Sequence, residues 1–358
     1  MTLHNLRHAF LLLLLACTAV SAPANARRIG DPPAKITEIP LTTKVSMPLQ
    51  MGFDDLSNLW VGAFHDGKIL RYTYNGDTQV YDVVSQAIQP ARGPMNMWVD
   101  RQDGSVWFTA IPAKIIHMQI GGTMTTYKVP SPRSMPMGIS RDSQGNIWFA
   151  EIFNNTIGVV RPSGKIDEFK IPQFFSMPAG LTVDRNDNKW FAMTRPGKIG
   201  VMRANGSFNF YNLPPRAHPM GIHYSKHQKT DLVWFTDTIG NSIGSITQDG
   251  QITLYRIPTK AAIPMMVMED GLGQVWFTEF AGNQIGMLGL DGKIKEYKVP
   301  THMAGPMGMD INPGDQSIWF TEVLRNKVGR LQNPSLPTTP PAPPMPMIVT
   351  NSPATPQN

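Results

Sequence analysis

Short segments in which polar and apolar residues alternate recur along most of the chain. They are separated by turns rich in glycine and asparagine. One set of such segments consists of residues 136–142, 147–151, 156–160 and 166–172. Alternation with a period of two places successive side chains on opposite faces of a strand. The four segments therefore predict four antiparallel strands.

This four-segment unit returns with a period of 41 to 47 residues. Its most regular marker is a tryptophan, found at residues 60, 107, 148, 190, 234, 276 and 319. Each tryptophan follows a proline by 12 to 15 residues, and these prolines are Pro48, Pro94, Pro136, Pro178, Pro219, Pro264 and Pro306. A strand-rich repeat of this length is typical of a β-propeller blade. Seven copies predict an all-β, seven-bladed propeller with four antiparallel strands in each blade.

The two ends of the repeat region predict how the ring closes. The seventh repeat stops after its third strand, at residues 327–331. Its missing fourth strand has a counterpart near the N-terminus, because residues 35–41 resemble the fourth strand at 294–300. We expect the N-terminal strand to complete the last blade and to remove an open sheet edge. In the repeat at 136–172, Trp148 and Phe149 should point to opposite faces of the sheet and fill the gaps to the two neighbouring blades.

The first 26 residues have the pattern of a secretory signal. An apolar run from Ala9 to Val20 precedes the small residues Ala24-Asn25-Ala26, where a signal peptidase would cleave. The alternative is a lipoprotein signal, because Leu14-Leu15-Ala16-Cys17 resembles a lipoprotein cleavage box with cleavage before Cys17, the only cysteine. The sequence thus predicts an exported protein, periplasmic or secreted, with no transmembrane segment after cleavage.

The C-terminal end differs in composition from the repeats. Nine of the residues in 333–358 are proline, which cannot donate hydrogen bonds to a sheet. We therefore expect a propeller domain at residues 27–332 followed by a disordered tail at 333–358. The formal net charge is +6, without a basic stripe interleaved with aromatic residues, so nucleic acid is not expected as a partner.

Methionine gathers at the predicted start of the inner strands, on the face where propellers bind ligands. It follows the blade-start proline in five repeats, as Met95, Met137, Met220, Met265 and Met307. These side chains predict either a soft plug in the channel or an adaptable apolar ligand site, with His218 and His302 as further ligand-binding candidates. Thioethers also suit Cu(I), with His218 and His302 as further ligands. The chain has no tight Met/His spacing, so Cu(I) is the less favoured alternative.

Acidic residues close the second strand in four repeats. They are Glu151, Asp237, Glu279 and Glu322. Carboxylates in equivalent places could hold a hard divalent cation, with Glu279 and Glu322 as the candidate metal ligands. The alternative is that each acid accepts amide hydrogens of a turn or pairs with a nearby base.

The repeat as a whole resembles the streptogramin B (virginiamycin B) lyase family. It reads Pro-x-Gly-Ile, then Gly-x-Ile-Trp-Phe-Thr-Glu, Asn-x-Ile-Gly and Ile-x-Glu-Tyr-x-x-Pro, with good copies at 274–279, 283–286 and 293–300. The resemblance covers about residues 35–331. It implies a magnesium-dependent carbon–oxygen lyase that opens a cyclic depsipeptide antibiotic by elimination across its ester, and so confers resistance.

The residues that the resemblance implies for catalysis are mostly replaced. A histidine base is implied after each of the last two blade-start prolines, where this chain has Met265 and Met307. A tyrosine is implied at Leu49 and an acid at Gly305, and only the acid at Glu322 remains. A methionine thioether cannot accept a proton from carbon.

The sequence therefore favours a propeller without the lyase histidines, which binds a small apolar ligand or an extracytoplasmic protein partner through its methionine-rich face. The alternative is an active lyase that uses Mg²⁺. In that case Glu279 and Glu322 would hold the cation, and Glu322 and the loop residue His302 would be the catalytic candidates.

Overall fold

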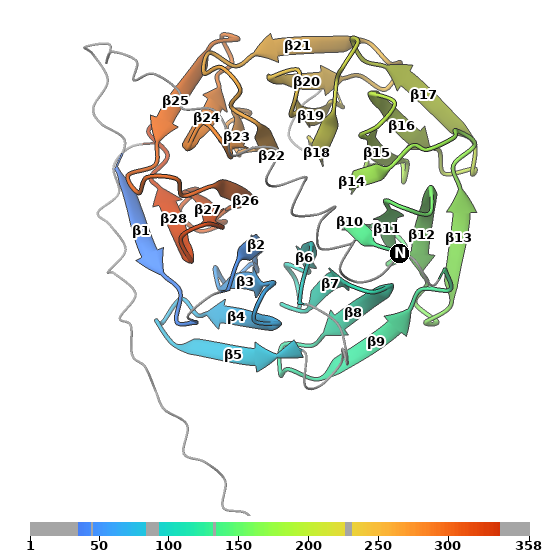
Figure 1. Cartoon of the computed structure of the whole chain (residues 1–358). Coiled ribbons are helices and arrows are strands. Elements are labelled where there is room, and N and C mark those ends of the chain that lie inside the picture. The colour runs from blue at the N-terminus through green and yellow to red at the C-terminus, as the bar shows by residue number, and fades with distance from the viewer. Residues whose placement is uncertain (1–34, 44–45, 84–92, 132–133, 226–230, 337–358) are drawn as a thin grey trace, which may run out of the picture.

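The fold is a ring of seven four-stranded antiparallel sheets around a central opening (Figure 1). The computed structural model describes residues 35–43, 46–83, 93–131, 134–225 and 231–336. The predicted signal segment, Cys17 and most of the proline-rich tail lie outside these residues. Each sheet is one blade, so the predicted seven-bladed β-propeller is confirmed.

In six blades the strands follow chain order from the axis outwards. The first three of these are β2 (Pro48–Phe53), β3 (Leu59–Ala63), β4 (Lys68–Tyr72) and β5 (Thr78–Asp82); β6 (Met97–Val99), β7 (Val106–Ala110), β8 (Lys114–Met118) and β9 (Met124–Lys128); and β10 (Pro136–Arg141), β11 (Ile147–Glu151), β12 (Thr156–Val160) and β13 (Ile166–Lys170). The next three are β14 (Pro178–Val183), β15 (Lys189–Met193), β16 (Lys198–Met202) and β17 (Phe208–Asn212); β18 (Pro219–Tyr224), β19 (Val233–Asp237), β20 (Ser242–Ile246) and β21 (Ile252–Arg256); and β22 (Pro264–Glu269), β23 (Val275–Glu279), β24 (Gln284–Leu288) and β25 (Ile294–Lys298).

The seventh blade joins the two ends of the chain. It contains β26 (Pro306–Ile311), β27 (Ile318–Glu322), β28 (Lys327–Leu331) and, as its outer strand, β1 (Ile36–Pro40). β1 pairs antiparallel with β28 along its whole length. Glu38 of β1 also accepts the backbone N–H and the hydroxyl of Thr301, both at 2.8 Å. The predicted closure by the N-terminal strand is confirmed.

The core lies between the blades, where sheet packs on sheet. Trp148 packs with Leu181 and Phe191 of the following blade, whereas Phe149 packs with Ile115 of the preceding blade. Large side chains at these positions fill both gaps, as the sequence predicted. Each blade is thereby held on both sides.

The buried tryptophans also anchor the turns at the far end of the inner strands. Asp142 follows β10, and its carboxylate accepts the indole N–H of Trp148 at 2.7 Å. Asp270 does the same for Trp276 at 2.8 Å and also accepts the side-chain amide of Asn333 at 3.1 Å. Asn333 is buried, so the first residues of the expected tail belong to the propeller. Within the described parts of the chain, no helix is long and apolar enough to cross a bilayer.

Candidate functional site

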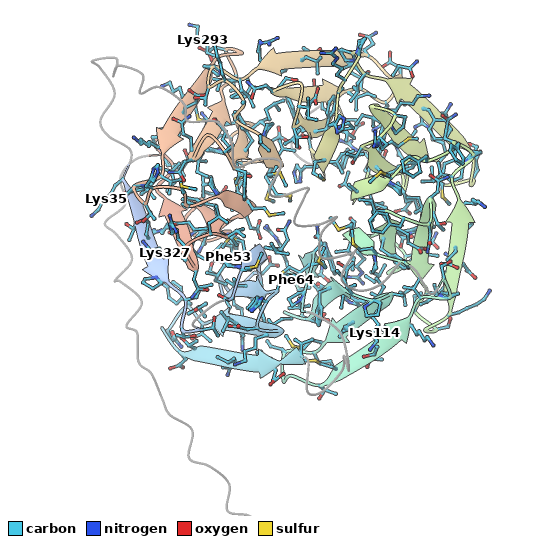
Figure 2. The ribbon with its side chains drawn as sticks, in the orientation of Figure 1. Lys35, Phe53, Phe64, Lys114, Lys293 and Lys327 are labelled. Atoms are coloured by element: carbon cyan, nitrogen blue, oxygen red, sulfur yellow. The ribbon has the colours of Figure 1, made fainter. Side chains whose placement is uncertain are left out.

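One face of the propeller collects the starts of the inner strands. On this face, crossover loops lead from the outer strand of one blade to the inner strand of the next. The turns between second and third strands lie there too, because the second strand runs antiparallel to the inner strand. We call these loops and turns together the entrance face. Figure 2 shows Phe64, from one of its turns, beside the central opening, whereas Lys293 lies at the outer edge of the ring.

A β-bulge at the start of the inner strand changes the direction of the residue after the proline. In the third blade, Met137 and Gly138 together oppose the single residue Ala150. β14, β18, β22 and β26 carry the same irregularity. A bulge bends the strand and re-aims its side chains. The result is one hydrophobic cluster drawn from five different blades, whose members include Leu49, Met95, Met137, Met265 and Met307.

The threonine of the second strand holds the bulge against the next blade. Thr278 Oγ1 accepts the N–H of Met266 at 3.1 Å and donates to the carbonyl oxygen of Met307 at 2.9 Å. Thr236 makes the equivalent pair of bonds one blade earlier. The Trp-Phe-Thr motif therefore supplies both the inter-blade core and the clamp that positions the methionine backbones.

A cavity of about 700 Å³ runs along the axis, which is within the usual size of small-molecule sites. Inner strands of all seven blades line it. Ten of its lining residues are methionines: Met51, Met95, Met97, Met137, Met220, Met265, Met266, Met268, Met307 and Met309. Methionine is flexible and polarisable, so this wall can adapt to apolar groups of different shape.

Glycine two residues after the proline allows neighbouring inner strands to approach closely. A Cβ added at Gly138 would lie 2.3 Å from the backbone nitrogen of Leu181, and one at Gly308 would lie 2.6 Å from the carbonyl oxygen of Leu49. Three blades have a larger residue at this position, namely Gln50, Asn96 and Met266, and all three line the cavity. The side-chain amide of Gln50 donates to the sulfur of Met266 at 3.4 Å.

The end of the cavity away from the entrance face is polar. Arg101 pairs with Asp310 at 3.2 Å, and Arg141 pairs with Asp100 at 2.6 Å. The guanidinium of Arg141 also lies 5.9 Å from the ring centroid of Trp98, which is a cation–π distance. Sequence reasoning missed this end, because residues from four separate turns and strands meet there only in the closed ring.

The predicted site residues separate into two groups. Met95, Met137, Met220, Met265 and Met307 all line the cavity. The two predicted histidines are not among its lining residues. The backbone N–H of His218 donates to Asp237 at 2.8 Å, and the exposed His302 accepts a bond from Arg325 through its carbonyl oxygen at 3.1 Å.

The acids that close the second strands are buried between strands and do not reach the cavity. Glu279 and Glu322, the predicted metal ligands, are fully buried and are not among the residues that line the cavity. Each such glutamate faces a second glutamate on the outer strand of its blade. The outer-strand acid in turn accepts a backbone N–H of the crossover loop, at 2.8 Å for Glu296 with Thr259.

Burial raises the pKa of these inner glutamates. Burial and the charge of Glu296 raise the pKa of Glu279 to about 8. Burial and the charge of Glu38 raise the pKa of Glu322 to about 8, and burial with the nearby Glu168 raises that of Glu151 to about 7. A carboxyl group whose pKa is about 8 is mostly protonated at neutral pH, whereas one whose pKa is about 7 is about half protonated. Glu279 and Glu322 are also not among the residues that line the cavity, so a cation in the cavity would not meet their carboxyl groups.

The described residues do not fit the magnesium site that the resemblance implies. No three histidine, cysteine or acidic side chains among them are arranged to hold a metal ion. Glu322 is directed at Glu38, and the position of the expected second acid is Gly305. The end of the cavity nearest the entrance face is lined by apolar, sulfur-containing side chains.

These features define a closed seven-bladed propeller with a methionine-lined axial cavity. The family model of the virginiamycin B lyase family matches residues 34–331. The chain belongs to that family. No curated protein matches it.

Solved structures of lyases are similar over most of the chain. A streptogramin B lyase is 31% identical, with a TM-score of 0.77 and coverage of 83% of this chain and 97% of the other. Virginiamycin B lyase from Staphylococcus aureus is 31% identical, with a TM-score of 0.78 and coverage of 84% and 99%. A catalytically inactive histidine-to-alanine variant of the S. aureus enzyme, with quinupristin, is also 31% identical to this chain. Its TM-score is 0.77, and the match covers 84% of this chain and 99% of the other.

Proposed function

We propose that this chain is an exported binding protein of the virginiamycin B lyase family that has lost lyase chemistry. It takes a small, mainly apolar ligand into the methionine-lined cavity. The observation that carries this proposal is the position of Met265 and Met307, which line the cavity where the family resemblance implies histidine bases. A thioether can contact an apolar group but cannot remove a proton from carbon.

The two ends of the cavity favour an amphipathic ligand with a defined orientation. Its apolar part would lie against the methionines of the entrance end, and a polar group would lie near Arg101 and Arg141. The streptogramin quinupristin, which accompanies the similar lyase variant, is a suitable first probe.

An assay for lyase activity tests the loss of chemistry. The purified chain is incubated with quinupristin and Mg²⁺, and the products are followed by liquid chromatography and mass spectrometry. We expect no linear product. Linear product that disappears in Glu322→Ala would instead establish an active lyase and contradict the proposal.

Substitution of cavity methionines tests binding. Glutamine has nearly the length of methionine but must be desolvated, so Met265→Gln with Met307→Gln should weaken binding of quinupristin by about tenfold or more. Binding is measured by calorimetry and by the change in tryptophan fluorescence, to which Trp98 in the cavity wall contributes. Met303→Gln is the matched control, because Met303 is exposed on the same face and outside the cavity. Equal losses in both variants would refute a cavity site.

The export part of the proposal has its own measurement. The intact mass of the chain recovered after export should correspond to a mature protein that begins at Arg27. A mass that begins at a lipid-modified Cys17 would establish the anchored alternative.

A further inference from the structure

The crossover loop between β13 and β14 carries two exposed aromatic residues. Phe174 is 97% exposed and Phe175 is 56% exposed, and their ring centroids are 6.1 Å apart. A phenylalanine exposed to this degree loses the favourable free energy of burial that its side chain would otherwise contribute. Phe153 of the neighbouring turn, on the same face, is also 42% exposed. This part of the entrance face is therefore unusually apolar for a solvated surface.

The backbone of this loop tip is shared with other blades, but its side chains are not. Phe175 has a φ of 57°, and the equivalent tip residues Arg216, Ala261 and Met303 have φ values of 69°, 51° and 52°. A left-handed conformation is uncommon for residues other than glycine and costs free energy for a bulky one. Four tips thus have one conformation, and only this one presents two adjacent aromatic rings.

The loop is held in place from below. The side-chain amide of Asn155 donates to the carbonyl oxygens of Ile171 at 3.0 Å and Gln173 at 2.6 Å. Its oxygen accepts the backbone N–H of Ser176 at 2.8 Å. The same asparagine clamp is present under the loops at Thr259 and Thr301. The two phenylalanines are consequently presented on a fixed support, so that binding through them costs little ordering of the loop.

Cations surround the aromatic tip. The guanidinium of Arg195 lies 5.9 Å from the ring centroid of Phe175, and the ammonium of Lys198 donates to the side chain of Gln173 at 3.2 Å. Arg216 is exposed on the next tip. The acids on the described loops and turns of this face between residues 152 and 241 are limited to Asp237, which is buried. The exposed charge here is therefore positive.

We infer that the tip formed by Phe174 and Phe175 docks on an anionic lipid surface. The rings would enter the headgroup region, where aromatic side chains are favoured, while Arg195 and Arg216 remain at the level of the phosphates. Two projecting aromatic side chains with cations beside them suit a lipid surface. A protein partner would need a complementary concave groove to receive them.

Vesicle sedimentation tests this inference. The chain purified in its exported form is mixed with vesicles of phosphatidylcholine alone or with phosphatidylglycerol, at low and high salt. We expect binding only to the anionic vesicles and weaker binding at high salt. Phe174→Ser with Phe175→Asn should lower the partition coefficient by about tenfold.

The matched control is His302→Ser with Met303→Asn at the equivalent tip of another blade, which should bind as the unchanged protein does. All variants should retain the melting temperature, because the altered side chains are largely exposed. The inference is overturned if the unchanged chain does not bind anionic vesicles, or if the phenylalanine variant binds equally well. Neither result bears on ligand binding in the cavity, which is measured without lipid.

Discussion

Met265 and Met307 begin two inner strands, and their side chains meet Leu49 and Met95 across the axis. Each lies after a proline and within a bulge, so its direction is set by backbone geometry and not by its own packing preference. The same backbone would direct a histidine into the cavity. The residue at each of these two positions therefore decides whether the cavity contains a general base, as with histidine, or an apolar contact, as with methionine. The fold is the same in both cases.

Thr278→Val is a test of the clamp at the residue scale. Valine keeps the volume but leaves the N–H of Met266 and the carbonyl of Met307 without their partner, so we expect a loss of about 2 kcal/mol in the free energy of unfolding. Urea denaturation measures it. Thr253→Val on an exposed outer strand is the control and should change stability by less than about 0.5 kcal/mol. Equal effects would show that the hydroxyl of Thr278 does not act as a clamp.

In three blades, the second strand and the outer strand each contribute one glutamate to a pair that lies beneath a crossover loop. In three blades an acid at the end of the second strand faces an acid of the outer strand, as Glu151 with Glu168, Glu279 with Glu296, and Glu322 with Glu38. The outer acid accepts hydrogen bonds from the loop, and burial raises the pKa of the inner acid. In each pair, the acid that holds the crossover loop therefore lies next to a buried carboxyl group with a raised pKa.

This arrangement predicts a stability that falls as pH rises. The pKa values of Glu279 and Glu322 are raised to about 8 in the folded state from the ordinary glutamate value of 4.5, so the folded state binds more protons than the unfolded state between these pH values. Stability is therefore greatest at low pH within this window and is lost as pH rises through about 8. We expect the melting temperature to be lower at pH 8.5 than at pH 6.5, on the order of 5 °C.

Calorimetry at the two pH values checks this expectation. Glu279→Gln with Glu322→Gln removes both titrating groups and should remove most of the difference. A melting temperature that is unchanged in the original chain would show that these carboxyl groups are already ionised at pH 6.5.

The whole molecule depends on the pairing of its two ends. β1 completes the seventh blade, and Glu38 ties it to Thr301 and Lys327. Deletion of residues 27–41 should therefore leave β28 as an open edge and expose the apolar side chains that Ile36 and Ile39 cover. We expect the melting temperature to fall by more than about 10 °C.

Deletion of residues 337–358 provides the matched control, since it shortens the chain without removing a described contact. It should leave the melting temperature within about 2 °C of the original value. If the N-terminal deletion behaved in the same way, ring closure through β1 would contribute nothing to stability.

The sequence by itself determined the number of blades, the strand order and the closure of the ring. These follow from local signals: the tryptophan period, alternating strand patterns and the complementary incomplete ends. It also identified the five methionines after the prolines, because equivalent positions in a closed repeat must point at a common axis.

Only the tertiary structure decided which polar residues line the cavity together with these five methionines. Glu279 and Glu322 are at equivalent places in the repeat, but burial between strands keeps them from the cavity. Arg101, Gln50 and Trp98 line it although no local pattern marks them. Their positions depend on how closely neighbouring inner strands approach, which is set by glycines and bulges acting together across blades. Such non-local packing is not readable from one repeat, because the wall of the cavity exists only when all seven blades have closed around the axis.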